Sequence, residues 1–216
     1  MLAFKIMSDP KKYSKFRTLL ILGAPGSGKG TQGKVLGSVP RFHHLACGDV
    51  FRSLDTRTAL GQKFVEYSSR GELVPDDLTV QLWRANIQQR VESHNFKPEI
   101  DFLVLDGIPR NVEQAKYMAD DIEVLQVFHL SCPDRAELAR RLRKRALKDN
   151  RFDDASDAVI FKRFQTYDEE TKPILDYYSN LVTDIDASQP PAKVLYDILH
   201  GVMQLPAWRD IAKLVV

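Results

Sequence analysis

Residues 18–32 read TLLILGAPGSGKGTQ, an apolar run that ends at a glycine-rich turn and leads into helical sequence. The run 18–22 predicts a buried strand, and the segment after the turn predicts a helix to about Val39. Glycines let successive backbone N–H groups turn toward one point, and a helix N-terminus adds partial positive charge there. The stretch therefore predicts a phosphate-binding loop, formed by Gly26, Ser27, Gly28, Lys29, Gly30 and Thr31.

The pattern of a strand followed by a helix recurs along the chain. Further short strands are predicted at 102–106, 124–130, 42–46 and 181–185, each next to helical sequence. Such alternation predicts an α/β fold of three layers, with a five-stranded parallel sheet covered by helices on both faces. Ligands of such sheets bind beyond the carboxyl ends of the strands, so Gly23, Asp106 and Ser131 are expected on one rim.

The length of 216 residues favours one domain. We assign that domain to 18–216, with an N-terminal leader at 1–17 that is expected to be flexible. The leader is Lys-rich and broken by Pro10, which favours a frayed end over a secretory or mitochondrial signal. Two segments, 48–77 and 145–154, do not fit the alternation and are predicted to be mobile excursions. The tail, with Trp208 and Ile211 at helical spacing, is expected to pack on the core.

The charge balance excludes several classes of function. Lys and Arg number 31 against 29 Asp and Glu, a net charge of +2, so neither nucleic acid nor a membrane surface is an expected partner. No apolar run approaches the roughly 18 residues of a membrane span. Cys47 and Cys132 lie far apart and form no C-x-x-C pair, so we expect a cytoplasmic protein without structural zinc. We also expect a monomer.

One detail of the phosphate loop points to a family. Ser or Thr commonly follows the lysine directly, whereas here Gly30 intervenes and the hydroxyl is on Thr31. The loop closely resembles that of adenylate kinases and is unlike those of shikimate kinases or regulatory GTPases. The resemblance implies that Mg²⁺ is held by phosphates and water, and that Asp106 contacts the metal through water.

Further motifs resemble the same family in the same order, namely LACGDVFR at 45–52, GELVPDD at 71–77 and DGIPR at 106–110. By resemblance, Arg52 and Arg110 hold the phosphate of the acceptor, and Gln114 hydrogen-bonds the edge of its base. The acceptor-binding residues implied in this way are Cys47, Arg52, Val74, Gly107, Arg110 and Gln114.

Arginines between 141 and 163 resemble those of the family's lid. The resemblance gives Arg141 to the ATP side and implies a catalytic set of Lys29, Arg52, Arg110, Arg145, Arg151 and Arg163. From Arg151 to Arg163 the spacing is one residue longer than usual, which predicts a bulge around Ala155. Only five residues separate Arg145 from Arg151, as in the branch with a short lid, so there is no room for a zinc-bearing insert.

The implied activity is the reversible transfer of the γ-phosphoryl group of Mg-ATP to AMP, giving two ADP. A uridylate-cytidylate or broad-specificity kinase is the alternative, because Cys47 stands where adenylate kinases have threonine, although Gln114 favours AMP. A non-catalytic relative would be expected to lose Lys29 or a phosphate arginine, and no Asn-Lys-x-Asp segment supports a switch GTPase. We expect no general base, covalent intermediate or catalytic histidine, and structural roles for His43 and His44.

Overall fold

The structure, a computed structural model, describes residues 14–149 and 156–212. Five strands form one sheet in which every neighbouring pair is parallel. Their spatial order is β2-β3-β1-β4-β5. The strands are β1 (Phe16–Gly23), β2 (Phe42–Ala46), β3 (Phe102–Asp106), β4 (Ile122–Ser131) and β5 (Val182–Asp186). The predicted α/β fold with a five-stranded parallel sheet is confirmed.

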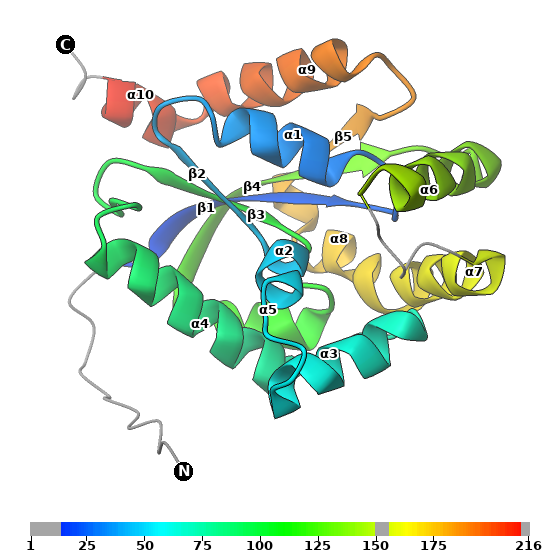
Figure 1. Cartoon of the computed structure of the whole chain (residues 1–216). Coiled ribbons are helices and arrows are strands. Elements are labelled where there is room, and N and C mark those ends of the chain that lie inside the picture. The colour runs from blue at the N-terminus through cyan, green and yellow to red at the C-terminus, as the bar shows by residue number, and fades with distance from the viewer. Residues whose placement is uncertain (1–13, 150–155, 213–216) are drawn as a thin grey trace.

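Helices cover both faces of this sheet, with α1, α9 and α10 above it and α4 and α5 below it in Figure 1. Beyond one end of the strands lie α2, α3, α6 and α7. No described helix is long and apolar enough to cross a membrane. The helices are α1 (Lys29–Leu36), α2 (Cys47–Arg52), α3 (Ala59–Ser69), α4 (Asp76–Glu92), α5 (Val112–Met118), α6 (Arg135–Asp149), α7 (Asp157–Thr166), α8 (Pro173–Tyr177), α9 (Pro191–Gln204) and α10 (Pro206–Ala212), with a π-helical turn at Tyr167–Thr171 and a 3₁₀ turn at Ser179–Leu181.

The apolar run in β1 is continuous because both faces of the strand are buried. Leu19 and Ile21 belong to the core between the sheet and α1, α6 and α9. Leu20 and Leu22 belong to the core between the sheet and α4 and α5. Side chains of a strand alternate between faces, so a run without polar breaks marks a central strand. Each such buried leucine contributes roughly 1.5–3 kcal/mol to stability relative to an exposed one.

The carboxyl ends of the strands meet at one rim, as predicted. Asp106 pairs in register with Ile21 of β1 and with Ala46 of β2, while Gly23 pairs with Leu130 of β4. The loop after β1 therefore lies between the ends of β3 and β4.

The structure corrects one prediction of detail and confirms another. The helix expected to reach about Val39 ends at Leu36, because Gly37 follows and Pro40 has no N–H to continue the hydrogen bonding. The tail prediction is confirmed for the described residues: Trp208 stacks on Phe42 with ring centroids 5.6 Å apart, and Ile211 is buried.

Candidate active site

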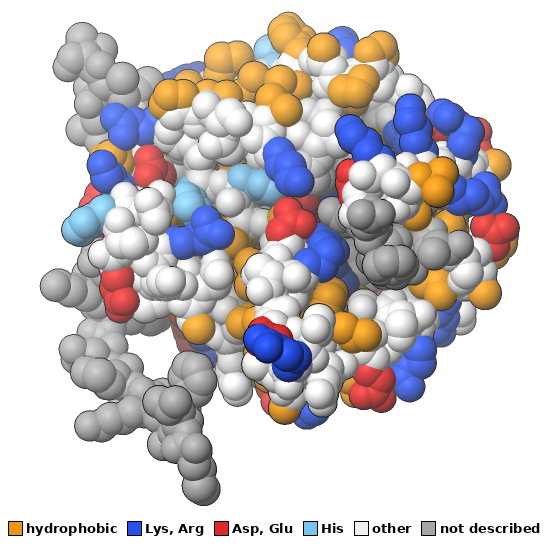
Figure 2. Space-filling model, viewed as in Figure 1, with side chains coloured by type: hydrophobic (Ala, Val, Ile, Leu, Met, Phe, Trp, Pro, Cys, Tyr) orange, Lys and Arg blue, Asp and Glu red, His pale blue; other side chains and the backbone are white. Residues whose placement is uncertain are grey.

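A cavity of about 820 Å³ opens at the rim formed by the carboxyl ends of the strands. On the face shown in Figure 2, Lys and Arg side chains gather near the centre of the molecule and over α6. Arg151, the second half of the segment 145–154 and the bulge expected around Ala155 lie outside the described residues. The other predicted site residues all line this cavity: Gly26, Ser27, Gly28, Lys29, Gly30, Thr31, Cys47, Arg52, Val74, Asp106, Gly107, Arg110, Gln114, Arg141, Arg145 and Arg163.

The glycine-rich loop turns sharply between β1 and α1. Gly26 and Gly28 have φ angles of 86° and 99°, a left-handed conformation that a side chain would strain. Gly28 is the N-cap of α1, so the first N–H groups of this helix face the cavity end of the loop. The backbone thus has the shape of an anion cradle.

Lys29 follows this loop and folds back onto it. Its Nζ donates hydrogen bonds to the carbonyl oxygens of Gly23 at 2.7 Å and Ala24 at 3.1 Å. Burial lowers the pKa of Lys29 to about 8, against the opposing attraction of the Asp106 carboxylate. The buried Oγ of Ser27 lacks a hydrogen-bond partner. Burial disfavours the charged form of Lys29, and the hydroxyl of Ser27 has an unsatisfied hydrogen bond. A bound polyanion would stabilise both groups.

Asp106 ends β3 at the back of the cavity. Its side chain is only 11% exposed, and its Oδ2 lies 3.9 Å from Nε2 of His44. Among the described residues no cluster of three or more His, Cys, Asp or Glu side chains could hold a metal ion. A single carboxylate instead suits Mg²⁺ that keeps most of its water and arrives on the phosphates of a nucleotide.

Two arginines on the other side of the loop lie against polar groups of their own chain. Nη2 of Arg52 is 2.6 Å from Oδ1 of Asp49, three residues before it in α2. Nε of Arg110 donates to the carbonyl oxygen of Gly107 at 2.9 Å, across the turn that contains a cis Ile108–Pro109 bond. Both guanidinium groups therefore have fixed directions beside the cavity, and each keeps further N–H donors.

The pocket beside these arginines is neutral. Cys47 is buried there, and burial raises the pKa of its thiol to about 11, so the sulfur stays protonated and unreactive near pH 7. Val74 and Gln114 are also buried in this wall. An apolar wall with one amide suits a flat heterocycle that needs a few directed hydrogen bonds.

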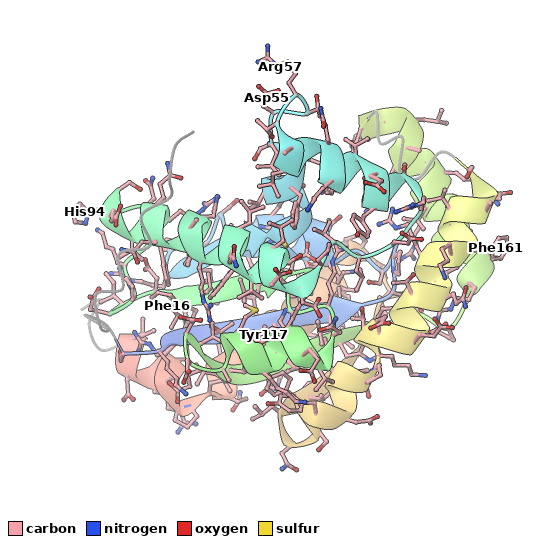
Figure 3. The ribbon with its side chains drawn as sticks, turned by 90° about the horizontal axis from the view of Figure 1, so that it is seen from below. Phe16, Asp55, Arg57, His94, Tyr117 and Phe161 are labelled. Carbon is pink, nitrogen blue, oxygen red and sulfur yellow. The ribbon has the colours of Figure 1, made fainter. Side chains whose placement is uncertain are left out.

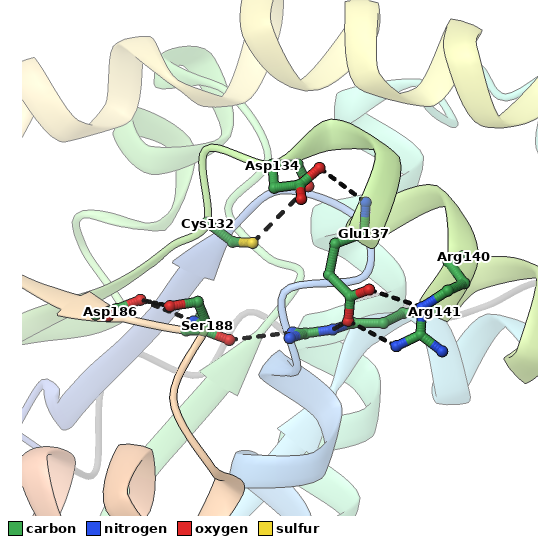
Figure 4. A network of polar contacts seen from close by, with 8 residues as sticks. Cys132, Asp134, Glu137, Arg140, Arg141, Asp186 and Ser188 are labelled. Atoms are coloured by element: carbon green, nitrogen blue, oxygen red, sulfur yellow. Dashed lines mark hydrogen bonds and ion pairs between the residues drawn. The ribbon is translucent and has the colours of Figure 1, made fainter.

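Arg141 occupies the opposite end of the cavity. Its Nε donates to Glu137 at 2.8 Å, and its Nη1 donates to the carbonyl oxygen of Ala187 at 3.1 Å, which connects α6 to the loop after β5 (Figure 4). Hydrogen bonds from Arg140 and Arg141 lower the pKa of Glu137 to about 2. The guanidinium group is thus held in place at the edge of the cavity by contacts from two segments.

The segment 48–77 and α7 touch each other over the cavity. Oγ1 of Thr166 donates to the carbonyl oxygen of Gly71 at 3.2 Å, and a Cβ at Gly71 would lie 3.1 Å from Cγ of Arg163. Figure 3 shows Asp55 and Arg57 at the outer tip of the excursion and Phe161 on the outer side of α7, all directed away from the sheet. The inner sides of these elements therefore form the roof of the cavity.

Sequence reasoning missed two acidic residues that shape the site. Asp49 holds Arg52, and Asp76 holds Gln114 through a hydrogen bond of 2.7 Å. Asp49 could have been found from its spacing of three residues from Arg52, which brings the two side chains together on a helix. Asp76 gave no signal, because its partner is 38 residues away in sequence.

Comparison with known proteins shows which family this chain is similar to. The family model described as adenylate kinase matches residues 21–183. A protein named adenylate kinase from a Cyanothece strain is 37% identical over 195 residues, covering 87% of this chain and 95% of the relative. The Chlamydia muridarum protein of the same name is 34% identical, covering 85% and 86%. Adenylate kinase 1 of Schistosoma mansoni is 34% identical, covering 92% and 98%.

Proposed function

This chain belongs to the adenylate kinase family and is an enzyme that transfers the γ-phosphoryl group of ATP reversibly to AMP, giving two ADP, and we propose how its residues divide that work. The observation that carries the proposal is the convergence of Lys29, Arg52, Arg110, Arg145 and Arg163 on one cavity. A polyanion in that cavity would meet cations from five different segments of the chain.

The ATP side is formed by the glycine-rich loop and Arg141. Backbone N–H groups of 26–31 would hold the phosphates, and Lys29 would exchange its two backbone carbonyl partners for outer phosphoryl oxygens. Arg141, which is held in place by Glu137 and Ala187, would stack along the adenine.

The acceptor side is formed by Arg52, Arg110 and the neutral wall of Cys47, Val74, Gly107 and Gln114. The phosphate of AMP would take Arg52 from Asp49, because a phosphate with two negative charges competes well with one carboxylate. Arg110 would bind the same phosphate while its Nε stays on Gly107. The base would then face the amide of Gln114.

Transfer in this arrangement requires alignment, neutralisation of charge and exclusion of water. The γ-phosphoryl group passes through a loose transition state, which asks for no covalent step by the protein. Arg145, Arg151 and Arg163 would neutralise its oxygens as the roof closes, and the absence of water would prevent hydrolysis of ATP. Mg²⁺, reached by Asp106 through water, would neutralise charge on the nucleotide phosphates.

A coupled assay of ADP formation from Mg-ATP tests the choice of acceptor. AMP, UMP, CMP and GMP are offered separately. We expect kcat/KM for AMP to exceed that for each of the others by at least about 10²-fold, because the amide of Gln114 would hydrogen-bond the edge of the adenine base. A preference for UMP or CMP would contradict the AMP assignment and favour the pyrimidine branch. ATP hydrolysis that did not depend on any acceptor would contradict the proposed division of the site.

The lowered pKa of Lys29 predicts a pH dependence for ATP binding. Only the protonated amine attracts phosphates, and one unit above its pKa about a tenth of the amine is protonated. Because that pKa is about 8 in the free protein, the Kd for metal-free ATP should rise about tenfold from pH 7 to pH 9. Titration calorimetry in two buffers of different ionisation enthalpy should also show proton uptake on binding at pH 9.

The matched control for this experiment is Lys29→Arg. The guanidinium stays protonated over the whole range, so its Kd, whatever its value, should be nearly constant with pH. A wild-type Kd that changes less than twofold between pH 7 and pH 9 would show that Lys29 does not titrate there.

A monomer acting in the cytoplasm completes the proposal. The cytoplasmic assignment is supported by the two free, buried cysteines, which suit a reducing compartment. Sedimentation at micromolar concentration should give the mass of one chain.

A further inference from the structure

The amide of Gln114 is held in one orientation. The side chain is 1% exposed and lines the cavity. Its Oε1 accepts a hydrogen bond from the backbone N–H of Arg110 at 2.8 Å, and its Nε2 donates to Oδ1 of Asp76 at 2.7 Å. A backbone N–H can only donate and a carboxylate can only accept. A reversed amide would therefore place its NH₂ group against the N–H of Arg110, and its oxygen against the carboxylate of Asp76.

Asp76 does not itself line the active-site cavity. It lies behind Gln114, beside a second, shallower hollow of about 390 Å³. Both of its carboxylate oxygens also accept from Nδ2 of Asn111, at 3.0 and 2.9 Å. Asn111 in turn caps α5 by accepting from the backbone N–H of Gln114 at 2.8 Å. The carboxylate is thus the common acceptor of two amides.

The position of Asp76 in the chain suits this role. It is the first residue of α4, where the positive end of the helix favours a carboxylate. Gln114 and Asn111 belong to the start of α5, after β3. Asp76 therefore joins the end of the 48–77 excursion to the part of the core that carries Arg110.

A fixed amide discriminates between two kinds of purine. With one hydrogen bond made at each end, Oε1 still has a lone pair and Nε2 still has a hydrogen. Adenine presents a donor at its 6-amino group and an acceptor at N1, which matches this pair. Hypoxanthine and guanine present an acceptor at O6 and a donor at N1, which oppose it. A site that leaves buried polar groups unpaired rejects the wrong base strongly.

We propose that Asp76 is a positioning residue for acceptor selectivity, which fixes the amide of Gln114 so that the site takes a 6-amino purine and rejects a 6-oxo purine. The inference rests on the proposed function, in which Gln114 reads the acceptor base. Asp76 touches no substrate and acts only through Gln114 and Asn111.

The experiment is a competition between AMP and IMP, which have the same size and phosphate and differ at the 6-position and N1. The ratio of their kcat/KM values is measured in one preparation with Mg-ATP, so any inactive fraction cancels. Asp76→Asn replaces a group that only accepts by one that also donates, which gives a reversed Gln114 amide a partner. We expect the ratio of AMP to IMP to fall about tenfold in this variant.

Three further variants fix the interpretation. Asp77→Asn removes the same charge from the same helical turn at an exposed position, and should leave the ratio unchanged. Asp76→Glu keeps an acceptor and should retain more of the preference for AMP than Asp76→Asn. Asp76→Ser introduces a residue that suits a helix start but has no carboxylate, and it should also lower the ratio. It replaces Asp76→Asn as the test if that variant does not fold.

The outcomes separate two failures. If Asp76→Asn lowers kcat/KM for AMP and IMP by the same factor, its role is merely structural and the inference is overturned. If Gln114→Ala leaves the ratio unchanged, or if the wild-type enzyme does not prefer AMP to IMP, then Gln114 does not read the base and the proposed function of that residue fails. A ratio that collapses in Gln114→Ala but not in the Asp76 variants overturns the inference alone.

Discussion

Lys29→Ala is expected to lower kcat by at least about 10³-fold without weakening the fold. Its amine lies against the glycine-rich turn, where it makes two hydrogen bonds to backbone carbonyls. In a closed site little water is present to screen phosphate charge, so the loss of one cation costs roughly 4 kcal/mol in the transition state. The coupled assay at saturating AMP and ATP measures the effect directly.

The stability of the same variant should move in the opposite direction. Burial lowers the pKa of Lys29 to about 8, which means that the fold disfavours the charged amine. Near pH 7 the amine is charged in both folded and unfolded chains, so the folded state bears the cost of burying it. That cost is absent in Lys29→Ala, and its thermal midpoint should equal or exceed that of the wild type.

Lys116→Ala is the matched control, because Lys116 is an exposed residue of α5 that pairs with Glu113 outside the cavity. It should keep wild-type kcat. If Lys29→Ala lost less than tenfold in kcat, or lost activity together with its fold, the assigned role would be wrong.

Arg110→Ala is expected to lower kcat/KM for AMP by about 10²- to 10⁴-fold. A guanidinium that binds phosphate through two charge-assisted hydrogen bonds contributes roughly 1.5–3 kcal/mol for each bond. Because Nε of Arg110 is already held by Gly107, little rotational freedom is lost when the phosphate binds. Steady-state kinetics with AMP varied at saturating Mg-ATP should show both a higher KM and a lower kcat.

Arg110→Lys tests the geometry separately from the charge. The ammonium keeps the charge but lacks the planar fork, so we expect only partial recovery of kcat/KM. Arg57→Ala, at the outer tip of the excursion where Arg57 pairs with Asp55, should have no effect. An Arg110→Lys enzyme with wild-type kinetics would show that charge alone suffices and would contradict the directed role.

The fold was predictable because its signals are local. The run Thr18–Leu22 lacks polar breaks because a central strand buries both faces, and residues 26–31 carry glycines where the turn needs left-handed backbone. The end of α1 was less predictable, since apolar spacing continues to Val39 although Gly37 and Pro40 stop the helix. The boundary of a helix depends on such competition rather than on periodicity.

The candidate site was predictable to the extent that motifs carry it. The phosphate loop and the Gly-Asp and DGIPR segments end strands of one parallel sheet, and the carboxyl ends of parallel strands share a rim. The sequence by itself thus determined the succession of strands and helices along the chain, the anion cradle and the identity of the cationic side chains. These features depend on neighbours within a few residues.

Only the tertiary structure decided how those groups behave. The pKa of Lys29 falls because folding buries its amine, although the Asp106 carboxylate partly opposes that fall. The amide of Gln114 has one orientation because Asp76, 38 residues earlier, accepts a hydrogen bond from it. Thr166 reaches Gly71 across 95 residues to form the roof of the cavity. Desolvation and contacts between distant segments arise only when the core brings those segments together. They therefore cannot be predicted from a local sequence pattern.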